Sequence, residues 1–223
     1  MEPNIESWVL SHYFLEMVLI PYSLFPITQI MNYLAHLFLA ESSPESRIGN
    51  LLGDFLKGNL EGYESVYSRE ILEGVKTHRL VDSFSDRHPI YLQSKRRIGA
   101  SNRRFAGIII DVCYDHFLTN HWGRFSQQSL ESFIEDVYKI LVENQKRLPL
   151  KLQGAIPRMV KEDWLGSYQT LEGISLTLTR IGRRFKRGNY LTDAGEELIN
   201  NYEEMESDFL LFFPELIDFV GEI

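Results

Sequence analysis

The stretch GIIIDVCYDHFLTNHW, residues 107–122, carries three ionisable side chains within an otherwise apolar run: Asp111, Asp115 and His116. On a helix, the two aspartates would stand one turn apart on the same face, where their like charges repel. His116 directly follows Asp115, so this pair could approach a common point. Because burying uncompensated charges is costly, we expect a cation to compensate them: Arg, Lys or a metal ion.

Three more segments place His or Asp among apolar residues. His36 lies in YLAHLFLA, Asp54 lies in LLGDFL, and His78 and Asp82 are four residues apart in THRLVD. Taken singly, such a His is more often a hydrogen-bonded core residue, and an HxxxD pair is often a local ion pair. Together, however, these residue types are ligands for Mn²⁺, Mg²⁺ or Zn²⁺, and the oxygen-rich set favours the harder ions. The pattern indicates a metal-dependent hydrolase.

Helices must position these side chains, because helical periodicity runs through the chain and strand signatures are almost absent. One helix should begin after Ser68, a plausible N-cap, and carry His78 and Asp82. The other expected helices cover 32–40, 47–58, 102–122, 126–144, 174–185 and 194–220, the last interrupted by Pro214. The sequence therefore predicts a single all-α domain.

The overall composition limits the kinds of site that the chain can hold. With 223 residues and 44% hydrophobic content, the chain can bury a sizeable core. Its single cysteine, Cys113, permits no intrachain disulfide and excludes a thiolate-rich metal site. It also fits a reducing compartment, so we expect a cytoplasmic protein. The net charge of −8 argues against general nucleic-acid binding.

Positive charge is nonetheless concentrated in two windows, 95–104 and 180–187, each with five basic side chains and no acidic one. These windows could attract an anionic partner. They could instead pair with the C-terminal segment, since ten Asp and Glu and no Lys or Arg follow Arg187. The charge pattern leaves both interpretations open.

The first thirty residues differ from the rest of the chain. They contain no Lys or Arg, and Pro21 and Pro26 interrupt their apolar part. A signal peptide would need a basic start and a cleavage site, and a membrane span would need about 20 apolar residues without central prolines. We therefore expect no stable membrane insertion. We place the domain over 31–223, with 1–30 as an extension or a misplaced translation start.

Four motifs, MNYLAHLFLA, GNLLGDFLKGN, GVKTHRLVD and DVCYDHFLTNHW, resemble in order and spacing those of the acyl carrier protein phosphodiesterases. The resemblance begins at Met31 and runs across most of 31–215. It implies an all-helical fold distantly similar to the HD-domain metal phosphohydrolases. It also implies an enzyme that removes 4′-phosphopantetheine from the serine of holo-acyl carrier protein, with Mn²⁺ as the preferred metal. The alternative is an HD-like phosphohydrolase that acts on a nucleotide or another small phosphodiester.

The resemblance points to the same residues as the burial argument. The expected metal ligands are His36, Asp54, His78 and Asp115. Asp82, Asp111 and His116 would either take the place of one of these ligands or orient one of them. His116 or His121 would be the general acid for the serine leaving group, and Arg79 would hold the phosphate. Phe38 departs from the family, whose members carry a second His at this place.

The resemblance also gives the basic windows a partner, because acyl carrier protein is small and strongly acidic. The expected docking residues would steer the encounter: Lys95, Arg96, Arg97, Arg103, Arg104, Arg183 and Arg184. The ligand types alone leave Mn²⁺, Mg²⁺ or another divalent ion open. The sequence does not indicate an oligomeric state.

Overall fold

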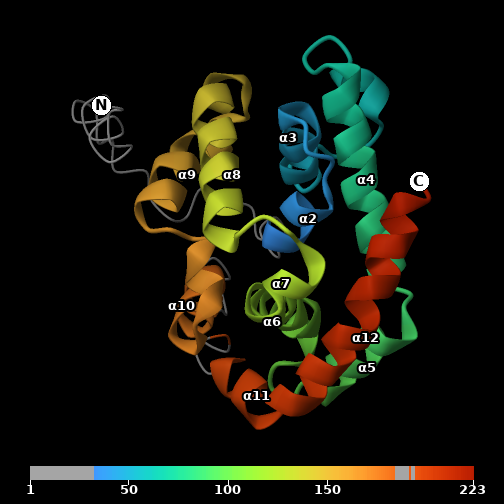
Figure 1. Cartoon of the computed structure of the whole chain (residues 1–223), viewed down its shortest axis with the longest axis vertical. Coiled ribbons are helices and arrows are strands. Elements are labelled where there is room, and N and C mark those ends of the chain that lie inside the picture. Colours follow the sequence, from blue (N-terminus) through green and yellow to red (C-terminus); the bar gives the residue numbers. More distant parts are fainter. Residues whose placement is uncertain (1–32, 184–190, 192–193) are drawn as a thin grey trace.

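The computed structural model describes residues 33–183, 191 and 194–223, which form helices and contain no strand. The prediction of an all-α chain is thereby confirmed. The predicted extension over 1–30 lies outside the described residues. Figure 1 shows α6 (Ala106–Asn120) near the centre of the arrangement, and this helix contacts α2 (Tyr33–Leu39), α5 (Pro89–Arg97), α10 (Leu171–Gly182) and α12 (Tyr202–Gly221). Among the described helices, none is both long enough and apolar enough to cross a bilayer.

Helices α3 (Pro44–Leu52) and α4 (Arg69–Ser85) pack at backbone contact distance. A Cβ atom added to Gly49 would lie 2.2 Å from the carbonyl oxygen of Ile71, so only glycine fits there. Helix α4 begins as predicted, since Ser68 accepts a hydrogen bond from the backbone N–H of Ile71. This close pair places the end of α3 beside the second half of α4.

The acidic C-terminal helices pack against the first basic window. Asp208 on α12 is buried and accepts hydrogen bonds from Gln93, Ser94 and Arg97 on α5. Glu197 on α11 (Ala194–Asn200) accepts hydrogen bonds from the loop that follows α5. Figure 1 shows α12 running along both α4 and α5. Part of the first basic window is therefore paired within the chain.

The remaining helices cover the other side of α6 (Figure 1). They are α7 (Trp122–Phe125), α8 (Leu130–Asn144), α9 (Leu150–Lys161) and α10, with short 3₁₀ turns between elements: η2 (Leu60–Tyr63), η3 (Arg103–Phe105), η4 (Gln145–Arg147) and η5 (Gly166–Gln169). Helix α8 buries one apolar face, at i, i+3 and i+4 spacing: Leu130, Phe133, Ile134, Val137 and Leu141.

Several predicted helix boundaries differ from the structure, and two of them change the path of the chain. The helix expected over 47–58 spans Pro44–Leu52, and the chain turns at Gly53, so that Asp54 lies in a turn rather than on a helix. The C-terminal helix was expected to be interrupted at Pro214, but α12 continues through this residue, whose side chain is exposed. The interruption lies at Asn201, between α11 and α12. Burial of the neighbouring aromatic residues on α12 offsets the hydrogen bond that the proline removes.

Candidate metal centre

Three side chains from two helices converge on one point. His36 extends from α2, and His78 and Asp82 stand one turn apart on α4; their ligand atoms all lie within 4.8 Å of one another. The Nε2 atom of His36 lies 3.2 Å from Asp82 Oδ1, and that of His78 lies 3.3 Å from Asp82 Oδ2. The two imidazole rings stack with their centroids 3.8 Å apart. We call these three residues the triad.

The imidazole nitrogens of the triad fit a bound cation. Both ring nitrogens of His36 and Nδ1 of His78 are buried, and none of them has a hydrogen-bond partner among the residues that the structure describes. The short contact from His36 to Asp82 does not have the alignment of a hydrogen bond. Buried polar atoms in folded proteins are almost always satisfied, and of these three nitrogens Nε2 of His36 is the one that faces Asp82, where an ion could satisfy it. Two imidazoles and a carboxylate suit a divalent ion.

Asp54 adds a second carboxylate beside the triad. Its Oδ1 atom lies 3.8 Å from Nε2 of His78. The approach depends on Gly53, because a Cβ atom at that position would lie 2.1 Å from Cγ of His78. The carboxylates are the accessible side of the cluster, since the Asp82 side chain is 52% exposed and that of His36 only 3%. The site is therefore open towards solvent on its carboxylate side.

The charges of the cluster shift the pKa values of its members in opposite directions. Burial alone would lower the pKa of His78, but Asp54 and Asp82 outweigh it and raise the pKa to about 9. Burial, together with the nearby His78, lowers the pKa of His36. Burial would raise the pKa of Asp82, but the two imidazoles hold it well below its ordinary value. A proton on His78 can thus compensate the carboxylates when no metal is bound.

Asp115 is placed at the start of α2 rather than in the triad. Its carboxyl group is fully buried and accepts hydrogen bonds from the backbone N–H groups of Ala35 at 2.9 Å and Leu34 at 3.1 Å. Both oxygens are thus engaged by the first turn of the helix that carries His36. Burial raises the pKa of Asp115, and these two amides offset part of the shift. Its predicted role as a ligand stays a prediction.

His116 does not share a point with Asp115. Its Nδ1 atom lies 2.7 Å from the carbonyl oxygen of Tyr168, and its Nε2 atom lies 3.1 Å from the hydroxyl of Tyr202. Consecutive residues on a helix point about 100° apart, which separates the two side chains. His121 pairs with Glu206 at 2.8 Å. The predicted role of either His as general acid stays a prediction, and neither belongs to the triad.

Arg79 supports the turn that carries Asp54. Its guanidinium donates hydrogen bonds to the carbonyl oxygens of Leu56 at 2.7 Å and Gly58 at 2.9 Å. The structure therefore gives this side chain a positioning contact beside its predicted role in holding phosphate. No sequence signal marked this contact, because it depends on how the turn folds back towards α4.

The remaining members of the predicted site have contacts of their own. Asp111 accepts a hydrogen bond from the hydroxyl of Tyr91 at 2.6 Å. Phe38 packs against Trp122 and Phe213 in an aromatic cluster. The sequence reasoning missed Tyr91, since nothing in its local pattern pairs it with Asp111.

The predicted docking residues fall into two groups. Lys95 and Arg97 are half-buried and pair with Asp86 at 3.2 Å and Asp208 at 3.0 Å. The second group is exposed: Arg96, Arg103, Arg104 and Arg183. Arg184 lies outside the described residues. Intramolecular pairing thus accounts for part of the first basic window and leaves the other part exposed.

Comparison with known proteins places this chain in a family. The sequence profile of the acyl carrier protein phosphodiesterases matches residues 31–216, beginning at the residue where we expect the domain to start. An acyl carrier protein phosphodiesterase of Photorhabdus laumondii is 32% identical over 189 residues, covering 84% of this chain and 94% of that protein. One of Yersinia enterocolitica is 33% identical over 188 residues, covering 84% and 96%. No solved structure matches, so the similarity to HD-domain enzymes stays a prediction. The chain belongs to the acyl carrier protein phosphodiesterase family.

Proposed function

We propose that this protein hydrolyses the phosphodiester that joins 4′-phosphopantetheine to the serine of holo-acyl carrier protein, releasing 4′-phosphopantetheine and apo-acyl carrier protein. The proposal is carried by the triad of His36, His78 and Asp82 in a chain whose relatives are named acyl carrier protein phosphodiesterases. These residues, brought together from two helices, are a donor set suited to phosphodiester hydrolysis.

The triad, with Asp54 beside it, would hold a divalent ion, and the family resemblance indicates Mn²⁺ rather than Mg²⁺. Such an ion, when bound, lowers the pKa of water and neutralises charge on phosphoryl oxygens. His36 and His78 close the buried side of the cluster, and Asp54 and Asp82 line its open side. The phosphodiester would therefore approach from the carboxylate side.

The exposed arginines would bring the carrier protein to this site. Arg96, Arg103, Arg104 and Arg183 stand at the surface, whereas Arg97 is held by Asp208. Exposed charges of this kind change the rate of encounter more than the affinity, and salt weakens them. We further propose that the domain begins at residue 31 and that the protein is cytoplasmic. Both proposals rest on the sequence.

Intact-protein mass spectrometry of holo-acyl carrier protein tests the proposed reaction. Incubation with this protein and Mn²⁺ should remove the phosphopantetheine mass, and a chelator should prevent the loss. His36→Ala and His78→Ala should abolish both the reaction and Mn²⁺ binding. His88→Ala is a matched control, because His88 is also buried but pairs with Glu215 on α12.

Two negative results have different meanings. Mn²⁺ binding without cleavage of holo-acyl carrier protein would leave the metal site in place and favour a small phosphodiester as substrate. Cleavage that persists in the chelated sample and in both His variants would contradict the assignment of the triad.

A further inference from the structure

The segment that joins α3 to η2 is held in place by side chains from other elements. It covers residues 53–59 and carries Asp54, so we call it the Asp54 turn. Three of its consecutive carbonyl oxygens accept hydrogen bonds from side chains: those of Leu56, Lys57 and Gly58. Arg79 on α4 donates to the first at 2.7 Å and to the third at 2.9 Å, and the hydroxyl of Tyr63 donates to the second at 3.2 Å.

The second half of the Asp54 turn depends on these bonds for its conformation. Lys57 and Gly58 are exposed, and a Cβ atom added to Gly58 would meet nothing within 4 Å. Gly58 also has a φ of +75°, a left-handed conformation that favours glycine. A segment with few packing contacts opens easily unless hydrogen bonds hold it. Arg79 supplies two of the three side-chain bonds that do so.

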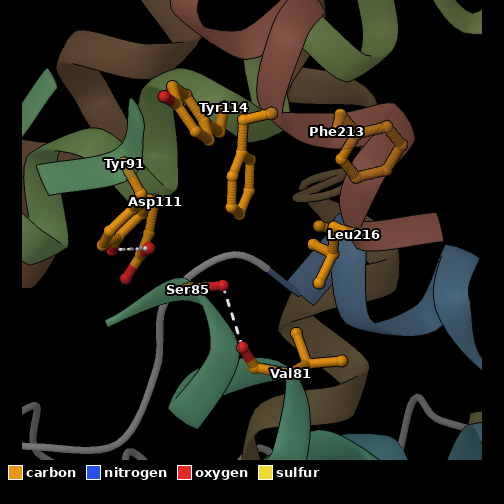
Figure 2. Close-up of a pocket in the computed structure, with 9 residues that line it drawn as sticks. Val81, Ser85, Tyr91, Asp111, Tyr114, Phe213 and Leu216 are labelled. Atoms are coloured by element: carbon orange, nitrogen blue, oxygen red, sulfur yellow. Dashed lines mark hydrogen bonds between the residues drawn. The ribbon is translucent and has the colours of Figure 1, made fainter. Parts of the chain in front are cut away.

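Helix α4 gives Arg79 a fixed base, because residues two apart on a helix point about 200° apart and Val81 faces the core. Figure 2 shows Val81 and Ser85 of α4 in the wall of a small pocket that Leu216 of α12 also lines. The hydroxyl of Ser85 donates to the carbonyl of Val81 at 2.9 Å, within α4 itself. Loss of the Arg79 side chain should therefore move the turn rather than the helix.

The Asp54 turn contacts the triad at two places. Oδ1 of Asp54 lies 3.8 Å from Nε2 of His78, and the ring of His78 fills the space above Gly53. Any shift of the turn would change both contacts. In addition, both terminal nitrogens of Arg79 already donate to carbonyl oxygens, so the fork that would bind a phosphate through two parallel bonds is engaged.

We propose that Arg79 is a positioning residue that holds the carboxylate of Asp54 beside the triad, rather than a group that binds the phosphate. This inference rests on the proposed function, in which Asp54 lines the open side of the metal site. Arg79 acts through the backbone, since the carbonyls that it binds lie two and four residues after Asp54. A carboxylate that is fixed in advance loses less conformational freedom when a cation binds.

Three variants test this role. Arg79→Lys keeps the charge but lacks the planar fork that spans two carbonyls. Tyr63→Phe removes the third bond to the turn and involves no charge. Ser85→Ala is the matched control, because it removes a side-chain bond to a carbonyl of α4 and none to the turn.

Each variant is measured in three ways. Calorimetry gives the Mn²⁺ affinity, and trypsin cleavage after Lys57, followed by mass spectrometry, reports the order of the turn in the metal-free protein. The constants kcat and KM are measured over a range of Mn²⁺ concentrations. The substrates are holo-acyl carrier protein and bis(p-nitrophenyl) phosphate, a phosphodiester that needs no protein docking.

Arg79→Lys should weaken Mn²⁺ binding by about 10–100-fold, the usual loss when a group that orients a metal ligand is changed. Tyr63→Phe should weaken it by about two- to tenfold, the effect of one hydrogen bond. Both should speed cleavage after Lys57, and Ser85→Ala should change neither property. Excess Mn²⁺ should restore the kcat of Arg79→Lys. Once Asp54→Asn is present, Arg79→Lys should weaken Mn²⁺ binding no further, because the two residues act as one unit.

Other outcomes separate this inference from the proposed function. Unchanged Mn²⁺ affinity in Arg79→Lys, or additive losses with Asp54→Asn, would overturn it; a higher KM that excess Mn²⁺ does not lower would then make Arg79 a phosphate contact. If Arg79→Lys does not fold, unchanged Mn²⁺ affinity in Tyr63→Phe would overturn it. A wild type that binds Mn²⁺ but cleaves neither substrate would contradict the proposed reaction, while the affinities still decide the role of Arg79. A wild type that binds no Mn²⁺ would contradict both proposals.

Discussion

Replacing Asp115 with alanine should unfold α2 rather than remove a metal ligand. In the folded protein its carboxyl group accepts hydrogen bonds from the backbone N–H groups of Leu34 and Ala35, and all three residues are buried. Alanine leaves both N–H groups without a partner. Each buried, unpaired group costs about 1–3 kcal/mol, so the free energy of unfolding should fall by about 2–6 kcal/mol. That is a large part of the 5–15 kcal/mol, roughly, that stabilises a domain.

The Asp115→Asn variant isolates the hydrogen bonds from the shape of the side chain. Its amide oxygen can accept from one N–H group, but its NH₂ group faces the other. The loss should therefore be about 1–3 kcal/mol, close to half that of the alanine variant. Urea unfolding followed by circular dichroism measures both losses, and calorimetry with Mn²⁺ measures the metal site in the same samples.

The pKa of Asp115 also predicts the direction in which the stability of the folded protein changes with pH. Burial raises the pKa of Asp115 in the folded protein, so folding favours the protonated carboxyl group. Wild-type stability should therefore fall as the pH rises from about 4, the ordinary carboxyl value, to the folded-state pKa. Asp115→Asn has no such group, so the gap between the two unfolding free energies should narrow over this range.

One result would refute the reasoning about Asp115. If Asp115→Asn unfolds at the wild-type urea concentration but no longer binds Mn²⁺, then Asp115 is a metal ligand. The hydrogen bonds to α2 would then contribute little to folding, and the expectation drawn from the sequence would hold.

Three further tests address the surroundings of the site, the docking surface and the pairing of the first basic window. Gly53→Ala should displace the His78 ring and weaken Mn²⁺ binding by calorimetry, whereas Gly62→Ala, where a Cβ atom meets nothing within 4 Å, should not; equal affinities would contradict the close approach. Arg103→Glu with Arg104→Glu should raise the KM for holo-acyl carrier protein at low salt and leave cleavage of bis(p-nitrophenyl) phosphate unchanged, since these residues lie at the surface; an unchanged KM would contradict docking there. Arg97→Gln should chiefly lower stability in urea, because Arg97 pairs with the buried Asp208.

The sequence indicated the members of the triad because residue type and spacing carry that information. His36, His78 and Asp82 are ionisable side chains within apolar segments, and His78 and Asp82 have the spacing of one helical turn. The structure brings them together from α2 and α4. Periodicity could not show which helices are neighbours, so the sequence alone ranked Asp115 above Asp82 as a ligand.

Residues that position the site carried a weaker signal. Gly53 matters because the ring of His78 occupies the space above it, and Tyr91 matters because its hydroxyl reaches Asp111. Both contacts join elements that are far apart in the sequence. Tyr91 also lies on α5, where only Tyr91 and Ser94 are buried among the described residues. Because so few of its residues are buried, the sequence of α5 shows no apolar periodicity that would predict a helix.

The three ionisable residues of 107–122 all have hydrogen-bond partners on other elements, and their predicted roles at a metal ion stay predictions. Asp111 accepts from Tyr91 on α5, Asp115 accepts from the first turn of α2, and His116 lies between Tyr168 and Tyr202. One apolar helix thus makes polar contacts to four neighbouring elements: α2, α5, η5 and α12. A metal ligand needs a lone pair that no donor occupies, and among the described residues Nε2 of His36, which faces Asp82, meets that condition. Asp115 therefore joins α6 to the first turn of α2, the helix that carries His36.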